Sequence, residues 1–331
     1  MYDRVEAIEA HLARAIERHG GTSPVYEMIC YHFGYDEAGA VRWGKRLRPR
    51  LLLQVVQAEG GRIEDALDAG VAIELLHNYS LVHDDIEDGD AMRHGRATVW
   101  SRFGVPHGIN AGDAMCGMSY LALLHNEAGL PPERMVAMLR VLHEANLKMC
   151  EGQGLDMHFE RLPNVSLTRY YEMIAGKTGA LFAASCELGA LAAGAAQPRV
   201  AAWAALGRAY GRAFQIRDDV LGIWGASEVT GKPSGADVER RKWSFPIAWA
   251  LEQRPSTDRE IIARAYGPAL RLDRNEVVEV IGALDRLGAR EAADEAHDGA
   301  LEEAARIAAQ ARIDAAGSVR EFFQEGARRV A

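Results

Sequence analysis

The sequence predicts an all-α protein, and three features of its 331 residues support this prediction. Alanine, leucine, glutamate and arginine, which are strong helix formers, recur throughout the chain. Long segments place apolar residues three and four positions apart, the spacing of a helix that buries one face. No convincing alternating strand set, low-complexity linker or short repeat interrupts these segments. We therefore expect residues 1–331 to form a single helical domain.

Several long segments have this helical pattern, and some of their ends carry recognisable signals. Pro49 suits the first turn of one helix, and Gly60 and Gly61 suit its end. Two polar loops that contain glycine, 89–106 and 225–243, each follow an aspartate-rich helix end. The predicted helices span residues 3–19, 49–59, 64–88, 132–160, 168–194, 198–224, 274–287 and 296–328, the last with a break near Gly317.

Composition excludes several classes of function and compartment. The formal net charge of −9 argues against a nucleic-acid partner, because nonspecific affinity for polyanions needs a basic surface. The four cysteines are far apart and form no CxxC pair, which is typical of reduced thiols in a cytoplasmic protein. The N-terminal segment is charged and lacks the apolar core of a signal peptide. Residues 179–196 are the least polar stretch but contain Glu187, so we expect no stable membrane insertion.

A first acidic cluster, HDDIEDGD, closes the predicted helix 64–88. Asp84 and Asp88 are four residues apart and therefore share one helical face, where like charges repel. They also lie at a helix C-terminus, the unfavourable end for negative charge. Both placements favour a compensating cation, and hard oxygen ligands favour Mg²⁺ shared with substrate phosphates. A solvated acidic helix end is the competing interpretation of this cluster alone.

A second acidic cluster, Asp218 and Asp219 in FQIRDDVLG, follows the apolar residues 198–217, and Gln215 lies one turn before it. An isolated pair of aspartates is common and by itself indicates little. The two clusters together are more informative, because each precedes a basic loop that contains glycine. If magnesium ions hold one diphosphate from two sides, two acidic clusters of this kind are required.

Basic residues occur at places that suit phosphate binding. The stretch GKRLRPR leads into a predicted helix start, where backbone N–H groups favour anions and arginine adds forked donors. Lys177 and Thr178 lie in AGKTGA, where small neighbours leave room for a phosphate. This segment is no P-loop, because Tyr171 occupies the position of the required glycine. A basic surface patch and a surface lysine are the competing interpretations.

His77 lies seven residues before Asp84 and so shares its helical face. A lone histidine on a helix is more often structural than functional, and that interpretation stays open beside a role in the site.

Seven motifs resemble, in order, those of the trans-type polyprenyl diphosphate synthases, the farnesyl and geranylgeranyl diphosphate synthases. They are GKRLRP (44–49), ELLHNYSLVHDDIED (74–88), MRHGRAT (92–98), GKTGAL (176–181), FQIRDD (214–219), TGKPSGAD (230–237) and KWS (242–244). One such motif is modest evidence, whereas seven in the same order are specific. The resemblance implies an isoprenoid-synthase type of helical bundle around a deep central cavity, usually a homodimer.

The resemblance also implies a role for each matching residue. Isopentenyl diphosphate would be held by Lys45, Arg48 and His77. The allylic diphosphate would be contacted by Arg93, His94, Lys177, Thr178, Gln215, Lys232 and Lys242. The magnesium ligands would be Asp84, Asp88 and Asp218, with Asp85 and Asp219 in support, and the site would hold three Mg²⁺ ions.

Two positions depart from the family pattern. His94 stands where the family often has a second arginine, and histidine donates more weakly to a diphosphate. Gly222 stands where the second motif usually carries a third aspartate, DDxxD. Asp237 in the following loop is a candidate to compensate for this missing carboxylate. Some similar synthases share the DDxxG form, so we do not interpret it as a loss of activity.

The implied activity is head-to-tail condensation of an allylic diphosphate with isopentenyl diphosphate, with release of diphosphate. Product length would depend on Leu76, Tyr79 and Ser80 below the first cluster, since bulk at the positions of Tyr79 and Ser80 shortens the product in similar enzymes. One bulky and one small residue favour a C20 product, geranylgeranyl diphosphate, with C15 farnesyl diphosphate next. The alternatives are a class I terpene cyclase, which needs no isopentenyl site, and a non-catalytic partner subunit of a prenyl synthase.

Overall fold

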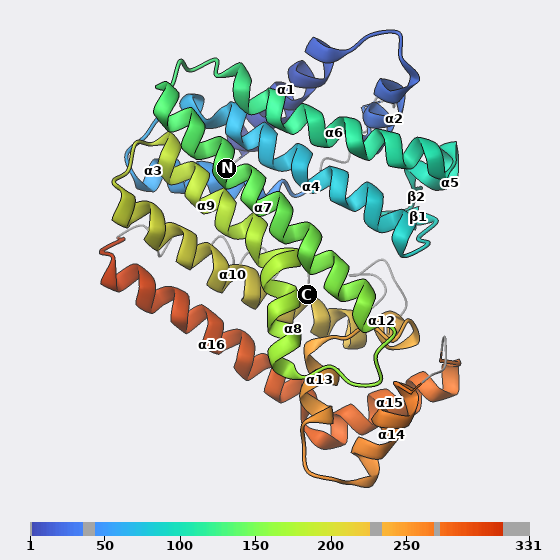
Figure 1. The fold of residues 1–331 in the computed structure, drawn as a ribbon. Helices are drawn as coiled ribbons and strands as arrows, with labels where there is room; N and C mark the ends of the chain where they lie inside the picture. The colour runs from blue at the N-terminus through green and yellow to red at the C-terminus, as the bar shows by residue number, and fades with distance from the viewer. Residues whose placement is uncertain (1, 36–43, 226–233, 268–271, 314–331) are drawn as a thin grey trace. The chain divides into compact units, whose positions relative to one another are not determined.

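The structure is a computed structural model of the chain, and it describes residues 2–35, 44–225, 234–267 and 272–313. Apart from one short hairpin, the regular structure of these residues is helical (Figure 1), which confirms the predicted all-α class. The residues group into two compact units: Met1–Glu144 with Ala184–Trp203, and Ala145–Ala183 with Ala204–Ala331. The predicted single domain with its central cavity stays a prediction.

The first unit contains the N-terminal helices and the hairpin. Its complete elements are α1 (Tyr2–His19), α2 (Pro24–Phe33), α3 (Leu47–Ala58), the 3₁₀ helix η1 (Ile63–Ala66), α4 (Leu67–Glu87), β1 (Met92–Arg93), β2 (Arg96–Ala97), α5 (Val99–Phe103) and α6 (Val105–His125). Three helices contribute residues to both units: α7 (Pro132–Phe159), α9 (Ala180–Ala192) and α10 (Gln197–Trp224).

Helix α4 lies along α6 in the first unit (Figure 1), and side chains of α4 pack against glycines of α6. A Cβ atom at Gly112 of α6 would lie 2.2 Å from Nε2 of His83. A Cβ atom at Gly108 would lie 2.9 Å from Cδ1 of Ile86. Side chains at both positions would displace His83 and Ile86, which lie at the end of α4 that carries the first acidic cluster. These glycines lower intrinsic helix propensity, which explains why the sequence analysis did not predict α6.

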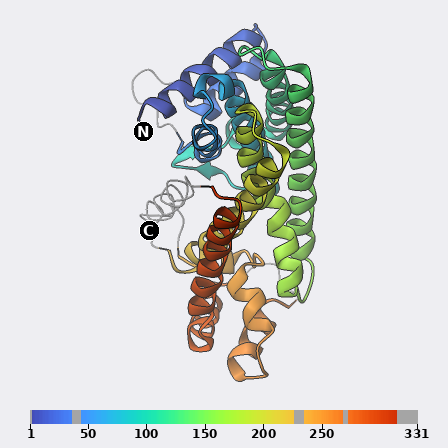
Figure 2. The ribbon, with the colours of Figure 1, turned by 90° about the vertical axis from the view of Figure 1, so that its left-hand side faces the viewer.

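The second unit is built around an aromatic and aliphatic core. Its further elements are α8 (Leu167–Ile174), the π-helical segment η2 (Ala175–Gly179), α12 (Ala236–Glu239), α13 (Phe245–Leu251), α14 (Thr257–Ala265), α15 (Arg274–Leu287) and α16 (Ala289–Gln310). The core includes Tyr170, Trp243, Phe245 and Tyr266, all of them buried. Helix α14 packs against α15, and both are orange in Figure 2.

Most predicted helix boundaries agree with the structure, and the exceptions have physical causes. The predicted helix 168–194 is divided by η2 into α8 and α9. The prediction that the last helix starts at residue 296 is wrong, because Gly288, with φ +78°, ends α15 and leads directly into α16. Its predicted end and Gly317 lie outside the described residues. The loop 89–106 contains the β1–β2 hairpin and α5, which the sequence analysis did not predict.

No described helix has the length and apolar character needed to cross a membrane. The segment 179–196, singled out as the least polar stretch, is mostly α9. Gly189 on this helix faces the backbone of α3, since a Cβ atom there would lie 2.5 Å from the carbonyl oxygen of Leu52. This close approach explains the small residues of the segment.

Candidate active site

The first acidic cluster lies at the end of α4, as the sequence predicted. Asp84 and Asp88 are partly exposed one helical turn apart, and the Asp88 N–H donates to the Asp84 carbonyl over 2.8 Å. Asp85 is different: it is buried, and its Oδ1 accepts from Nε and Nη2 of Arg93 at 2.9 and 2.8 Å. Asp85 therefore orients a cation, whereas Asp84 and Asp88 present carboxylates on a neighbouring face.

The β1–β2 hairpin presents Arg93 next to this cluster. His94 and Gly95 form its two-residue turn, with φ of 50° and 80°, as a type I′ turn requires. His94 is exposed in this turn, whereas Arg93 is half-buried against Asp85. A hydrogen bond joins the two ends of the loop that contains the hairpin, since Thr98 Oγ1 donates to the Asp90 carbonyl over 2.8 Å. Residue 94 thus adopts the left-handed conformation that this turn needs, which glycine and polar residues tolerate best.

Arg46 of the basic GKRLRPR stretch points inward. It adopts the left-handed backbone conformation, φ 46°, and is buried between two carboxylates. Its Nε donates to Glu9 of α1, and its Nη1 donates to Oε1 of Glu74 on α4 over 2.8 Å. These ion pairs fix the turn between Lys45, which is exposed, and Arg48, which is half-buried. Arg46 therefore supports the predicted isopentenyl diphosphate subsite from behind.

His77 and Arg48, predicted to share that subsite, are brought close together. Burial lowers the pKa of His77 well below its usual value, and the positive charges of Arg48 and Arg93 lower it further. Burial also lowers the pKa of Arg48 to about 10, while Glu74 opposes that shift. His77 is therefore a neutral imidazole among cations near neutral pH, an environment that favours an incoming anion.

His32 belongs to the same buried network. Asn78 donates through Nδ2 to Oε1 of Glu74 over 2.9 Å, so its Oδ1 accepts from Nε2 of His32, also 2.9 Å away. Burial lowers the pKa of His32 to about 4, although the hydrogen bond to Asn78 opposes the shift. His32 thus stays neutral and holds α2 to α4.

Replacing Arg46 with methionine is expected to lower the free energy of unfolding by about 3 kcal/mol, because Glu9 and Glu74 would stay buried without their shared cation. The matched control is Arg62→Met, since Arg62 forms an exposed ion pair and should change stability by less than about 0.5 kcal/mol. Urea denaturation measures both variants. Equal stability of the two would show that the Arg46 ion pairs contribute nothing to the fold.

Stability is expected to fall from pH 7 to pH 5 partly because of His32. At pH 5 the unfolded histidine binds a proton, whereas folded His32, with a pKa of about 4, does not. The variant His32→Gln removes this difference, so its loss of unfolding free energy over the same pH interval should be smaller by about 1 to 2 kcal/mol. Denaturation curves at both pH values test this, and identical pH dependence in the two proteins would contradict it.

In the second unit, Asp156 of α7 holds two of the predicted diphosphate-binding lysines. Its Oδ2 lies 2.6 Å from Nζ of Lys177 and 3.6 Å from Nζ of Lys242, and Glu160 accepts from Lys242 over 3.1 Å. Burial alone would raise the pKa of Asp156, but the two lysines outweigh it and lower the pKa. An ionised carboxylate therefore keeps two cations close together that would otherwise repel each other.

The second acidic cluster is supported by a chain of hydrogen bonds. Thr178 donates to Gln215 over 2.5 Å, and Gln215 donates to Oδ1 of Asp219 over 2.8 Å. The other Asp219 oxygen accepts from the Tyr170 hydroxyl at 2.6 Å and the Phe245 N–H at 2.7 Å. Burial raises the pKa of Asp219 to about 7, while these three hydrogen bonds oppose the rise. Both carboxylate oxygens of Asp219 thus accept hydrogen bonds from residues within the second unit.

Asp218, by contrast, is exposed and lies in the last two turns of α10 rather than at its end. Asp218 and Asp219 therefore differ in burial in the same way as Asp84 and Asp85 do in the first unit. One carboxylate faces outward and its neighbour is buried among donors. Lys232, predicted to contact the same diphosphate, lies outside the described residues.

The π-helical segment η2 carries Lys177 and Thr178, and two glycines bring α7 against it. A Cβ atom at Gly152 would lie 2.1 Å from the backbone nitrogen of Lys177, and one at Gly176 would lie 2.6 Å from the carbonyl oxygen of Lys148. Single π turns within helices are frequent at functional sites. Here this turn and the glycine contact together place Lys177 within reach of Asp156.

The variant Gly152→Ala is expected to push α7 away from η2, lowering the unfolding free energy by about 1 to 3 kcal/mol and displacing Lys177. Gly154→Ala is the matched control, because Gly154 is exposed on the same helix and a Cβ atom there meets nothing within 4 Å. That control should be slightly stabilising, by less than about 1 kcal/mol. Thermal unfolding measures both, and a neutral Gly152→Ala would show that the contact is not tight.

Several residues that support the predicted site carry no assigned role in the functional motifs recognised in the sequence. These are Glu9, Glu74, Asp156 and Tyr170, each buried and each bonded to a predicted site residue or its neighbour. A weak signal existed for Asp156, which lies four residues after Gly152 in EGQGLD and therefore shares its helical face. No local pattern identifies Glu9 or Tyr170, because their partners are distant in sequence.

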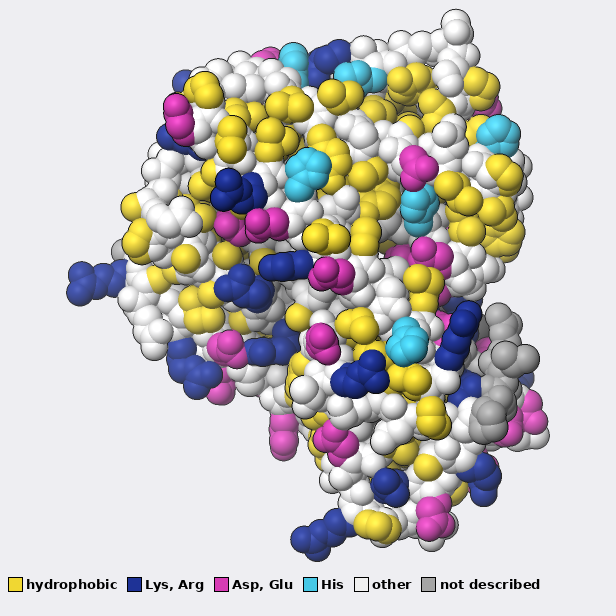
Figure 3. Space-filling model, in the orientation of Figure 1, with side chains coloured by type: hydrophobic (Ala, Val, Ile, Leu, Met, Phe, Trp, Pro, Cys, Tyr) yellow, Lys and Arg dark blue, Asp and Glu magenta, His cyan; other side chains and the backbone are white. Residues whose placement is uncertain are grey.

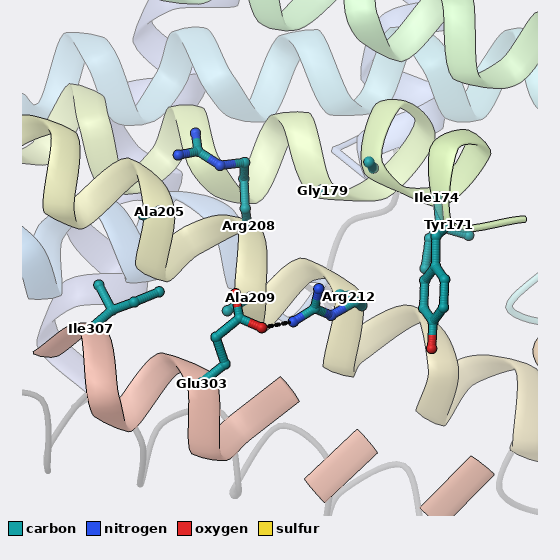
Figure 4. A pocket seen from close by; sticks show the side chains of 10 residues that line it. Tyr171, Ile174, Gly179, Ala205, Arg208, Ala209, Arg212, Glu303 and Ile307 are labelled. Atoms are coloured by element: carbon teal, nitrogen blue, oxygen red, sulfur yellow. Dashed lines mark hydrogen bonds and ion pairs between the residues drawn. The ribbon is translucent and has the colours of Figure 1, made fainter. Parts of the chain in front are cut away.

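A separate pocket of the second unit is formed by α8, α10 and α16 (Figure 4). Tyr171, Ile174, Arg208, Arg212 and Glu303 are among its lining residues. Arg212 and Glu303 form an ion pair, and Arg208 points away from that pair. None of the predicted site residues lines this pocket, so it is distinct from the cluster around Asp156 and Asp219.

Comparison with known proteins agrees with the all-α fold. The crystal structure of a geranylgeranyl pyrophosphate synthetase from Pyrococcus horikoshii superposes with a TM-score of 0.84 and 33% sequence identity, covering 97% of this chain and 95% of that one. The class of fold is therefore that of the isoprenoid synthases. Residues 38–284 match the family model described as polyprenyl synthetase. The chain belongs to the polyprenyl synthetase family, as its motifs predicted.

Curated relatives include two different synthases. A geranylgeranyl diphosphate synthase of Mycobacterium tuberculosis is 41% identical over 263 residues, which cover 78% of this chain and 73% of the relative. A (2E,6E)-farnesyl diphosphate synthase of Mycobacterium bovis is 40% identical over 240 residues, which cover 71% of this chain. The match spans 66% of that relative's length, just under two thirds.

Proposed function

We propose that this protein is a trans-prenyltransferase that condenses an allylic diphosphate with isopentenyl diphosphate, head to tail, and releases diphosphate. The observation that carries the proposal is the repeated arrangement of acidic and basic groups. In each unit an outward-facing aspartate lies beside a buried one, and cations are held nearby by buried carboxylates. Family membership and the names of both relatives support the same activity.

The acidic groups fit magnesium. Asp84, Asp88 and Asp218 offer hard carboxylate oxygens at accessible positions, the chemistry that Mg²⁺ prefers when it shares its shell with phosphates. We assign three Mg²⁺ ions to these residues and to one diphosphate. Bound magnesium would neutralise the charge that develops on the departing diphosphate.

The cations then divide between the two substrates. Lys177, Lys242 and Arg93 bind the allylic diphosphate, with Thr178, Gln215, His94 and Lys232 in the same subsite. Lys45, Arg48 and His77 bind isopentenyl diphosphate. Preorganised positive charge of this kind stabilises the leaving group without further rearrangement, and removing one such contact typically slows catalysis by about a hundredfold. Apolar surroundings would keep water from the allylic cation, and the released diphosphate would accept the proton.

A class I terpene cyclase is the second candidate, since it also ionises an allylic diphosphate. Such an enzyme needs no isopentenyl subsite. The neutral His77 beside Arg48, with Arg46 supporting the turn between Lys45 and Arg48, favours the synthase. A non-catalytic partner subunit is disfavoured because the first acidic cluster is complete.

We also propose a homodimer that uses the outer face of α6. Ile109, Leu121 and Leu124 on this helix are 45%, 49% and 54% exposed, an unusual density of large apolar side chains for a solvated face. Hydrophobic side chains are visible across this part of the surface in Figure 3. The dispersed free cysteines support a reducing, cytoplasmic location.

The proposed activity is tested by incubating the protein with labelled isopentenyl diphosphate and C5, C10 or C15 allylic diphosphates, with and without Mg²⁺. Magnesium-dependent growth of the prenyl chain is the expected result. Asp84→Asn should reduce turnover by at least about a hundredfold, because a ligand of the magnesium that would neutralise the leaving group is lost. Cyclised hydrocarbon would favour the cyclase, and full activity of Asp84→Asn would overturn the assignment of the first cluster.

Product length is expected to depend on Ser80, which lies one turn before Asp84 on the same face of α4. Its small side chain donates to the His77 carbonyl over 2.8 Å, whereas Tyr79 is buried with its ring against His83. Leu76, a turn deeper, is fully buried. We expect wild-type protein to form mainly C20 product, with C15 next, and Ser80→Phe to shift the product to C15 or shorter. Mass spectrometry measures the shift, and unchanged length would contradict the assignment.

A further inference from the structure

Three side chains that can bind metals lie close together in the first unit. Within the part of the chain that the structure describes, His11, Asp68 and Glu127 form the one group of three histidine, cysteine or acidic side chains whose ligand atoms all lie within 4.8 Å of one another. His11 belongs to α1, Asp68 to the first turn of α4, and Glu127 follows the end of α6. Asp84 lies sixteen residues beyond Asp68, about 24 Å along α4, so this group is distinct from the proposed active site.

The distances between these ligand atoms are close to those around a zinc ion. Nε2 of His11 lies 2.8 Å from Oδ1 of Asp68 and 3.7 Å from Oε2 of Glu127. Zinc binds nitrogen and oxygen at about 2.0–2.2 Å, so two ligand atoms of a tetrahedral site lie about 3.3–3.6 Å apart. The two observed distances lie on either side of this range. Movements of about half an ångström would therefore bring all three ligands around one ion.

Hydrogen bonds of the loop after α6 hold the group together. The Glu127 N–H donates to Oδ2 of Asp68 over 2.7 Å, which leaves Oδ1 of Asp68 next to His11. Asn126, with φ 47°, ends α6, and its side chain exchanges two hydrogen bonds with the backbone of Leu130, over 3.0 and 2.8 Å. The backbone that carries Glu127 is thus fixed on both sides, as a preorganised site requires.

The group combines a buried imidazole with an accessible carboxylate. The side chains of His11 and Asp68 are 4% and 12% exposed, whereas that of Glu127 is 60% exposed. Burial alone would raise the pKa of Asp68, but the hydrogen bonds from His11 and from the Glu127 N–H outweigh it and lower the pKa. An ion would therefore meet a buried nitrogen and an ionised oxygen, and it would be open to water on the side of Glu127.

The hydrogen bonds of His11 define what an ion would replace. Nη2 of Arg14 lies 2.6 Å from Nδ1 of His11, and arginine can only donate, so Nδ1 accepts and Nε2 carries the proton that is donated to Asp68. An ion at Nε2 would take the place of this proton, which would move to Nδ1. Arg14 is exposed and can turn into solvent. The competing explanation is a hydrogen bond between His11 and Asp68 that serves the fold alone, in which Glu127 has no part.

The imidazole decides which metal fits. Nitrogen ligands suit first-row transition ions such as Zn²⁺, whereas Mg²⁺ prefers oxygen ligands alone. We propose that His11, Asp68 and Glu127 bind a divalent first-row transition ion, of which Zn²⁺ fits this ligand set best. The ion would join α1 to α4 and to the loop after α6. Because α1 also carries Glu9, which holds Arg46, the ion would stabilise the helix that supports the predicted isopentenyl diphosphate subsite.

The first experiment measures zinc binding by calorimetry, with metal-free protein and excess Mg²⁺ to occupy the proposed magnesium ligands. Wild type should bind one Zn²⁺ per chain that Mg²⁺ does not displace. Glu127→Gln removes one ligand and leaves the hydrogen bond between His11 and Asp68 intact, so its dissociation constant should rise by at least about tenfold. The matched control is Glu133→Gln, an exposed acid in the first turn of α7, which should bind Zn²⁺ as wild type does.

The second experiment tests the histidine through thermal unfolding. At a Zn²⁺ concentration a hundred times the dissociation constant, the unfolding temperature of wild type should rise by about 4 °C. The variant His11→Gln should lose this rise. The control is His19→Gln, which removes another histidine of α1 and should keep the rise.

Three results would overturn the metal site. They are a wild type that binds no Zn²⁺ in excess Mg²⁺, a Glu127→Gln that binds Zn²⁺ as tightly as Glu133→Gln, and a His11→Gln that keeps the full rise in unfolding temperature. Magnesium-dependent prenyl transfer, measured on the same preparations of wild type, tests the proposed function separately. Loss of the zinc site would leave that function standing, and absence of prenyl product would leave the zinc site standing.

Discussion

Mutual repulsion between like charges is the constraint on which this structure depends. A site for diphosphates needs several cations close together, and a site for magnesium needs several carboxylates, before either ligand arrives. Buried carboxylates resolve the first problem here: Asp85 holds Arg93, and Asp156 holds Lys177 and Lys242. Because these acids are buried, their attraction for the cations is weakly screened by solvent. The cations are thereby fixed in place without bound substrate.

The site also needs its charged groups to be held in place, and close packing at glycines contributes to this. Gly112 lets α6 approach the end of α4, and Gly152 lets α7 approach η2. In both cases a residue of the proposed site lies within a few positions of the contact. Side chains at these glycines would displace the neighbouring groups, including the backbone of Lys177. Gly222 is a third example, where the space goes to a carboxylate from another segment.

A division of labour between adjacent aspartates follows from helix geometry. Neighbouring residues on a helix point about 100° apart, so one member of a pair can face inward while the other faces outward. Asp85 and Asp219 are buried among donors, whereas Asp84 and Asp218 are accessible. The inward member orients its surroundings and the outward member is available for a metal. This explains why paired aspartates suit such a site better than single ones.

The sequence by itself determined the features that depend on neighbours along the chain. Helical periodicity located most helices, and the four-residue spacing of Asp84 and Asp88 placed both on one face, because helix geometry is local. The order of the charged motifs identified the family. The same local rules failed for α6, whose glycines oppose helix formation until α4 covers them.

Only the tertiary structure decided which charged residues face inward. Arg46 looked like one of several surface cations, but Glu9 and Glu74, distant in sequence, bury it. Asp156 gained its role from two lysines on other elements, and Asp237 gained its position from an empty space at Gly222. The physical reason is common to all three: burial and charge pairing depend on what the folded chain brings within a few ångströms, and no local spacing contains that information.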